Sequence, residues 1–177
     1  MRILGIDPGL QVCGYACLKT GSGQNKLIEA GVFRTKGESA IEIRLNRIAE
    51  DIESLLKKFR PEIAAIEQLY SHYEHPRTAI LMGHARGVIL QKCAQATVEV
   101  RSFSATRVKK SITGSGKAGK EQVQRTIQAI LSLQQLPEPS DVADAIAVAL
   151  CCANSMKGFD SALVPCDSEH ERRVTKL

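Results

Sequence analysis

Features of a membrane or secreted protein are missing from this sequence of 177 residues. No apolar run approaches the roughly 20 residues that a membrane-spanning helix requires. Asp7 interrupts the apolar segment near the start, so no export signal is recognisable there. The six cysteines include no Cys-x-x-Cys pair, which argues against a disulfide framework or a thiolate metal site. We therefore expect a cytoplasmic protein with reduced, buried thiols and no membrane contact.

Zinc ligands and sequence repeats are equally scarce. His72 and His75 could form half of a zinc site, but no second pair of ligands has the required spacing. With 44% hydrophobic residues and no internal repeat, the chain should form one domain with a substantial core. We expect this domain to span residues 1–153, and the polar residues 154–177 to form a loosely ordered tail.

Negative charge is absent from one long segment of the chain. The formal net charge is only +5, but no acid occurs between Arg101 and Glu121. The basic residues in and next to this segment are Arg101, Arg107, Lys109, Lys110, Lys117, Lys120 and Arg125. Such bunching favours binding to a polyanion, with a solvated basic surface as the alternative.

Hydrophobic periodicity and turn residues predict an α/β domain with a mixed five-stranded sheet flanked by helices. The expected strands are Arg2 to Asp7, Val12 to Lys19, Leu27 to Thr35, Ile63 to Glu67 and Thr97 to Phe103. The expected helices are Ile41 to Phe59, Pro76 to Gln95, Thr106 to Ser111, Glu121 to Leu133 and Asp141 to Ala153. Short connections make the first three strands an antiparallel meander.

Two of the expected helices are preceded by capping signals. Ser39 with Glu42 resembles a capping box at the start of the first helix. Ser140 has the place of an N-cap at the start of the last helix.

Acidic residues end two of the predicted strands. Asp7 follows an apolar run and precedes a Pro-Gly turn, and Glu67 closes a run of the kind expected for a strand buried on both faces. If these strands are parallel neighbours, both acids lie at carboxyl ends, about 5 Å apart, where open α/β sheets place their sites. Two carboxylates at this distance repel each other unless a cation binds between them. The pattern thus indicates a divalent-metal site.

Two more acids stand in the last predicted helix. Asp141 and Asp144 are three residues apart and share one helix face. Asp141 alone is explained by the favourable interaction of an acid with a helix N-terminus. Asp144 is not, because its face continues into Val148 and Cys151, which should be core, and its own helix offers no basic partner. A helix that crosses the sheet edge could bring both acids to the two strand ends.

The resulting set of ligands predicts a chemistry. Four oxygen-donor carboxylates suit Mg²⁺, with Mn²⁺ as a substitute, rather than zinc. Two such ions would support hydrolysis of a phosphodiester, and the bunched cations would hold the backbone of a nucleic acid. Tyr70, three residues after Glu67, would stack on an unpaired base, unless it packs back on the sheet.

Five segments of the chain occur together in an order and spacing that one known family shares. They are Gly5 to Gly9, Ile66 to Gln68 with Tyr70, Gly83 to Gly87, Gly116 to Lys120 with Gln122 and Val123, and Asp141 to Ala145. The set resembles the RuvC family of bacterial Holliday junction resolvases, and the resemblance extends from Arg2 to Ala153. The chain departs from the family at His84, where Gln is more usual, and at Val142, where Ala is. The segment from His72 to Arg77 has no clear match.

This resemblance implies an RNase H-like fold and Mg²⁺-dependent cutting, by a homodimer, of two opposed strands of a four-way DNA junction. The implied catalytic metal ligands are Asp7, Glu67, Asp141 and Asp144. Lys109 and Lys120 match lysines that contact substrate phosphates, and Tyr70 matches an aromatic residue that stacks on a junction base. The helix that begins at Pro76 resembles the one at the dimer interface. The RuvA–RuvB branch-migration complex is implied as a partner.

Two other functions stay open. One is that of a smaller RuvC-like nuclease that processes ribosomal RNA precursors, and the other is recognition of branched DNA without cutting. The basic segment, Tyr70 and the paired acids of the last helix favour the junction enzyme. The presence of all four carboxylates argues against a protein that only binds.

Overall fold

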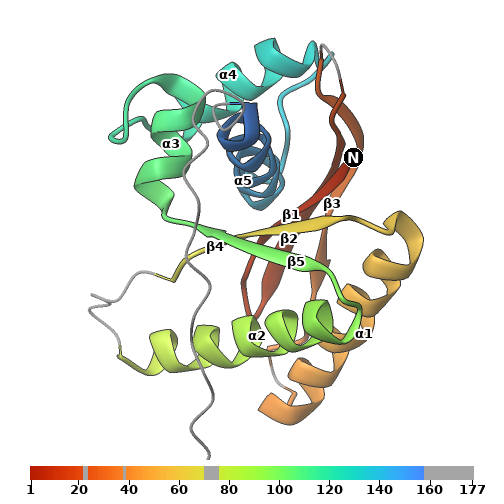
Figure 1. Cartoon of the computed structure of the whole chain (residues 1–177). Coiled ribbons are helices and arrows are strands. Elements are labelled where there is room, and N and C mark those ends of the chain that lie inside the picture. The colour runs from red at the N-terminus through yellow and green to blue at the C-terminus, as the bar shows by residue number, and fades with distance from the viewer. Residues whose placement is uncertain (22–23, 38, 70–75, 158–177) are drawn as a thin grey trace, which may run out of the picture.

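A mixed sheet of five strands lies between two layers of helices in the computed structural model, which describes residues 1–21, 24–37, 39–69 and 76–157 (Figure 1). The strands are β1 (Arg2–Asp7), β2 (Val12–Lys19), β3 (Lys26–Arg34), β4 (Ile63–Glu67) and β5 (Glu99–Phe103). The helices are α1 (Ile41–Phe59), α2 (Pro76–Gln95), α3 (Ala105–Thr113), α4 (Lys120–Leu131) and α5 (Ser140–Lys157). The sheet order is β3-β2-β1-β4-β5, with β1, β2 and β3 antiparallel and β1, β4 and β5 parallel.

The α/β architecture predicted from the sequence is confirmed, with small shifts at the ends of its elements. β3 ends at Arg34 rather than Thr35, and β5 begins at Glu99 rather than Thr97. α5 continues to Lys157, so the first residues of the expected tail are helical. Residues 158–177 lie outside the described residues, and a loosely ordered tail there stays a prediction.

The predicted capping box is wrong. The N-cap of α1 is Ala40, and no side chain donates or accepts a capping hydrogen bond there. Ser140 is already the first residue of α5 rather than its N-cap. The backbone N–H of Val142 donates to the Pro139 carbonyl oxygen (2.9 Å) and so begins the helix.

Two separate cores form because successive residues of a strand point to opposite faces of the sheet. Ile3 and Ala65 lie in the core under α3, α4 and α5. Leu4 and Ile66 lie in the core against α1 and α2. Figure 1 shows these two groups of helices on opposite sides of the sheet. The odd-numbered residues of β1 and β4 therefore face α5.

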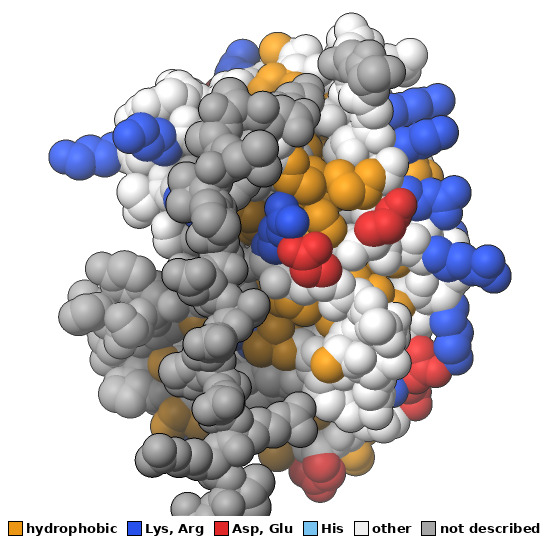
Figure 2. All heavy atoms as spheres, viewed as in Figure 1, with side chains coloured by type: hydrophobic (Ala, Val, Ile, Leu, Met, Phe, Trp, Pro, Cys, Tyr) orange, Lys and Arg blue, Asp and Glu red, His pale blue; other side chains and the backbone are white. Residues whose placement is uncertain are grey.

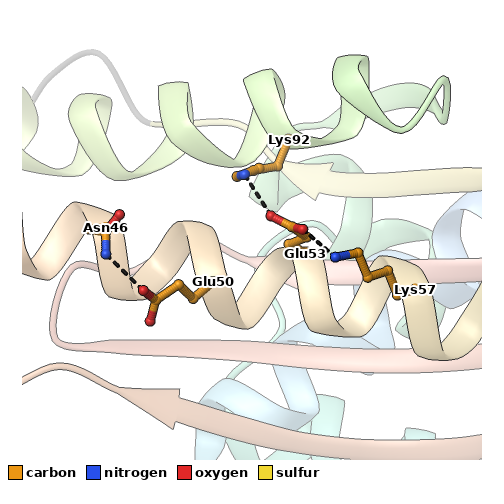
Figure 3. A network of polar contacts seen from close by, with 5 residues as sticks. All are labelled: Asn46, Glu50, Glu53, Lys57 and Lys92. Atoms are coloured by element: carbon orange, nitrogen blue, oxygen red, sulfur yellow. Dashed lines mark hydrogen bonds and ion pairs between the residues drawn. The ribbon is translucent and has the colours of Figure 1, made fainter.

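A polar network joins α1 to α2 (Figure 3). Glu53 of α1 accepts hydrogen bonds from Lys57, one turn later, and from Lys92 of α2 (2.8 Å). These two ammonium groups lower the pKa of Glu53 to about 2. Nearer the start of α1, Asn46 donates a separate hydrogen bond to Glu50 (2.8 Å). Because Glu53 is bound from both helices, the network helps to set how α2 lies against α1.

The described cysteines are buried and free, as expected for reduced thiols. Cys13, Cys17 and Cys93 belong to the core against α1 and α2. Cys151 and Cys152 belong to the core under α5. None of the helices in the described ranges is long and apolar enough to cross a membrane.

Candidate metal centre

Asp7 and Glu67 end neighbouring parallel strands. The register pairs Ile6 of β1 with Ile66 of β4, so the two acids are the next residues along each strand. Both are odd-numbered and therefore lie on the face that α5 covers. Both are partly buried, which places two carboxylates side by side at one edge of the sheet.

α5 crosses this end of the sheet in direct contact with the strands. A Cβ on Gly14 would lie 2.0 Å from the Asp141 carbonyl oxygen, and a Cβ on Gly5 would lie 2.2 Å from that of Ala145. Only glycine leaves room for the helix backbone at both places. Gly14 pairs with Asp7 across the β1–β2 ladder. The contact thus brings the first turn of α5 next to Asp7.

The acids of β1, β4 and α5 act on one another electrostatically. Burial raises the pKa of Asp7 from 3.8 to about 8, and the charges of the other three carboxylates add to the shift. Burial and the charge of Asp144 raise the pKa of Glu67 from 4.5 to about 7. Burial also raises the pKa of Asp144, to which Asp141 adds. Such repulsion requires that the acids lie near one another.

Two lysines compensate part of this negative charge. Against the effect of burial, Lys120 at the start of α4 lowers the pKa of Asp7, Glu67 and Asp144. Lys109 of α3 acts in the same direction on Glu67 and Asp144. Both ammonium groups therefore stand close to the carboxylates, where they could also meet an anionic ligand.

The other bunched cations are not all available to a ligand. Arg101 pairs with Glu99 (2.7 Å) and Arg125 with Glu121 (2.7 Å). On the face shown in Figure 2, lysine and arginine side chains lie mostly toward the edges, and acidic side chains are interspersed. The positive charge that the sequence concentrates in one segment is therefore partly neutralised in the fold.

The donor set fits a hard divalent cation. Carboxylate oxygens are the ligands that Mg²⁺ and Mn²⁺ prefer, and a cation between them would relieve the repulsion that raises the pKa of Asp7 and Glu67. Within the described ranges, no three carboxylate, histidine or cysteine side chains already stand in a metal-binding arrangement. An ion would therefore have to draw the carboxylates closer together.

The raised pKa values make metal-free stability depend on pH. Asp7 and Glu67 keep their protons up to a pH of about 8 and 7 in the folded state, but lose them near 3.8 and 4.5 when unfolded. The folded state thus binds more protons in this window, so the free energy of unfolding falls as pH rises through it.

We expect the melting temperature in EDTA to be lower at pH 8.5 than at pH 5.5 by roughly 5 °C or more. Added Mg²⁺ should recover most of the difference at the higher pH, because it binds only the folded state tightly. Calorimetry at both pH values checks this. A melting temperature in EDTA that is higher at pH 8.5 than at pH 5.5 would contradict the raised pKa values of Asp7 and Glu67.

A family profile described as "Crossover junction endodeoxyribonuclease RuvC" matches residues 3–152. The chain belongs to the RuvC family. A relative of that name from Rhodopirellula baltica is 47% identical over 149 residues, which are 84% of each chain. The family that the five sequence segments indicate is therefore confirmed.

Solved RuvC structures have the same architecture. The Thermus thermophilus RuvC structure has a TM-score of 0.81 and 32% identity, and the match covers 90% of this chain and 97% of that one. T. thermophilus RuvC in complex with Holliday junction substrate also has a TM-score of 0.81, at 29% identity over 89% and 96% of the two chains. The RNase H-like fold is thus confirmed.

RuvC membership also gives the activity. RuvC proteins are crossover junction endodeoxyribonucleases, so the chain is a phosphodiester hydrolase that resolves Holliday junctions in DNA recombination and repair. Nucleases of the RuvC family depend in general on divalent metal, in keeping with the carboxylates at the end of β1 and β4.

Some residues singled out in the sequence lie outside the described residues. They are Tyr70, His72, His75 and Cys166. Stacking of Tyr70 on a junction base therefore stays a prediction. Arg77 and His84 are exposed on α2, so histidine at the position where RuvC proteins more often have glutamine leaves the core unchanged.

Gly5 and Gly14 are absent from the site residues predicted from sequence, although they position α5. A signal for them exists, because both stand inside predicted strands, where glycine usually marks a close backbone approach. The sequence does not tell which element makes that approach. In this RuvC protein it is the helix that carries Asp141 and Asp144.

Proposed function

We propose that Asp7, Glu67, Asp141 and Asp144 bind the divalent cations for junction cleavage, two Mg²⁺ ions with Mn²⁺ as a substitute. The supporting observation is the raised pKa of Asp7 and Glu67, which burial and mutual repulsion produce. Buried acids that repel one another are costly and mark functional sites when a cation can balance them. Bound divalent ions would supply Lewis acidity for hydrolysis of the phosphodiester.

The chain itself supplies rigid placement. The residues just before Asp7 and Glu67 are fully buried core residues of β1 and β4, so the backbone at both acids is well supported. Asp141 and Asp144 sit on the first turns of α5, whose later residues are buried. Carboxylates held by three packed elements, β1, β4 and α5, can hold a cleavage site in a defined geometry.

Lys109 and Lys120 are proposed to contact the phosphate at the cleaved bond. Lys120→Gln should lower junction cleavage by roughly 10- to 100-fold, because a developing negative charge loses its counter-charge. The pKa of the neighbouring acids should rise further, so the pH at which cleavage is fastest should move upward. Single-turnover rates from about pH 6 to 9, at saturating protein, measure both effects.

The matched control is Lys117→Gln, which removes the same charge three residues before Lys120, in the α3–α4 connection. Lys117 is not among the groups that shift the pKa of the carboxylates. Its cleavage rate and pH profile should stay near those of the unmodified protein. An equal loss of cleavage rate in the two variants would show that Lys120 only attracts DNA and does not act at the cleaved bond.

A homodimer is proposed to form through the outer face of α2. Ala85 and Ile89 face the core, whereas Ile80 is 60% exposed. A Cβ on Gly83 or Gly87 would meet nothing within 4 Å, and these glycines stand four residues apart on one helix face, where a second helix could approach closely. A two-fold dimer would present two identical sites to a two-fold junction.

The remaining partner and the location also follow from the family as proposals. The RuvA–RuvB complex would deliver the junction, and chromosomal DNA as the substrate would place the protein in the cytoplasm. The RuvC match over residues 3–152 favours junction resolution over processing of ribosomal RNA precursors and over binding without cutting.

The first test is incubation of the purified protein with Mg²⁺ and an end-labelled synthetic four-way junction, beside linear duplex and structured RNA. Paired symmetric nicks in the junction alone are expected. Cutting of the RNA would favour the processing nuclease. Tight junction binding without any cutting would favour the protein that only binds.

A further inference from the structure

A basic pocket lies at the β3 edge of the sheet, outside the group of carboxylates. It is a hollow of about 250 Å³. Four cations line it, together with Thr35 and Ile43: Arg34, Lys36, Arg44 and Arg47. No acid is among its lining residues in the described part of the chain. A hollow with this lining attracts anions.

Most of this positive charge has no ion-pair partner among the described residues. Arg47 pairs with Glu50 and Asp51 on its own helix. For the other three cations of the pocket, the described residues include no ion-pair partner. Arg34 and Lys36 are exposed, so a ligand can reach them without any rearrangement of the fold. The uncapped first turn of α1 adds backbone N–H donors on the same side.

Hydrogen bonds tie the pocket to the turn that follows Asp7. Thr35 Oγ1 donates to the Leu10 carbonyl oxygen (2.5 Å). Arg44 donates from Nε to Thr35 Oγ1 (3.1 Å) and from Nη2 to the Leu10 oxygen (3.2 Å). The backbone N–H of Thr35 donates to the Gln11 oxygen (3.0 Å). The wall of the pocket is therefore held in fixed relation to the carboxylate end of β1.

The pocket also lies at the same end of the sheet as Asp7. Arg34 pairs with Val12, and Asp7 pairs with Gly14 on the same strand. Two strand spacings and two residues along the strand separate the backbones of Arg34 and Asp7, a distance of roughly 12 Å. The α1 residues of the pocket lie on the face of the sheet opposite α5, so a DNA strand would pass around this end of the sheet to reach them. A DNA strand rises about 3.4 Å per nucleotide, so two to four nucleotides would span this distance.

We infer that this pocket binds a backbone phosphate of the DNA arm that is being cut, two to four nucleotides from the cleaved bond. The inference rests on the proposed function, because it assumes that DNA lies over the carboxylates. Arg34 and Lys36 meet the phosphate, and Arg44 holds the wall in place. Ile43, which is 60% exposed, offers an apolar surface to the deoxyribose.

The decisive variant is Arg34→Gln with Lys36→Gln. Its dissociation constant for a four-way junction should rise about 10-fold near 0.1 M salt, and the slope of log affinity against log salt should fall by about 1, for the one phosphate contact that is lost. The single-turnover cleavage rate at saturating protein should stay within about twofold, because the carboxylates are intact.

The matched control is Lys19→Gln with Lys26→Gln, a pair at the opposite end of the same β2–β3 hairpin. It removes the same charge about 25 Å away and should change junction affinity less than twofold. Equal affinities for the two double variants would overturn the inference and point instead to an acidic protein partner for the pocket. Lys36→Gln alone, on an exposed side chain, should give about half of the effect on the salt slope if the double variant folds poorly.

Chemically neutral DNA gives an independent test. Methylphosphonate linkages two to four nucleotides from the mapped nick should weaken binding by the unmodified protein, but should not weaken binding by the Arg34→Gln, Lys36→Gln variant any further. Additive losses would overturn the inference. Failure of the unmodified protein to cut the junction at all would instead count against the proposed function, so the two failures are distinguishable.

Discussion

Asp7→Asn should abolish junction cleavage, with a fall of at least about 1000-fold in the single-turnover rate. Asparagine keeps the shape of the side chain but removes a charge that a divalent cation needs from a central ligand. Junction affinity should stay within about twofold, because the bunched lysines and arginines are untouched. Cleavage and gel-shift assays on the same end-labelled junction check both parts.

The same substitution should make the metal-free protein more stable above a pH of about 8. Asp7 is ionised there at the expense of burial and repulsion, and a neutral amide avoids that cost. A higher melting temperature in EDTA with no cleavage would separate loss of chemistry from loss of fold. Glu50→Gln, which removes a negative charge from the exposed face of α1, should change neither property. Retained cleavage in Asp7→Asn would remove Asp7 from the metal site.

Gly14→Ala should cost about 100-fold or more in cleavage rate, although alanine adds only one methyl group. The new Cβ would begin 2.0 Å from the Asp141 carbonyl oxygen, so β2 or α5 has to move by about 1 Å or more. A displacement of that size at an active site can cost about 100-fold. Overpacking should also lower the free energy of unfolding by roughly 2 kcal/mol.

Gly21→Ala is the control for Gly14→Ala. Nothing lies within 4 Å of a Cβ built on Gly21, so rate and stability should both be unchanged. Urea unfolding gives the stability, and the rate should be measured well below the unfolding transition. A folded Gly14→Ala protein that cuts at the normal rate would show that the carboxylates do not depend on the close seat of α5.

The acids at the strand ends could be predicted because they break a rule of buried strands. β1 and β4 read as continuous apolar runs, and a carboxylate directly after such a run has to be explained by function. Asp144 was detectable for a similar reason, since its helix face is otherwise core. In each case a local mismatch between residue type and expected burial carried the information.

Other features depend on contacts that a sequence does not display. The N-cap of α1 is Ala40 rather than Ser39, although the Ser-x-x-Glu spacing predicts a capping box that begins at Ser39. The close packing of α5 on the sheet depends on Gly14 lying on the face of β2 that α5 covers. The Glu121–Arg125 pair was not predicted from the sequence, although residues four apart on a helix are neighbours. The pair reduces the charge available for DNA.

The distribution of the buried thiols gives each layer of the molecule its own chemical reporter. Burial raises the pKa of every described cysteine, so none forms a reactive thiolate readily until its surroundings open. Cys93 reports opening between the sheet and α2, and Cys152 reports detachment of α5. The rate of alkylation at each cysteine therefore measures how often its layer separates from the sheet. Bound metal should slow alkylation only at Cys152, in the helix that carries Asp141 and Asp144.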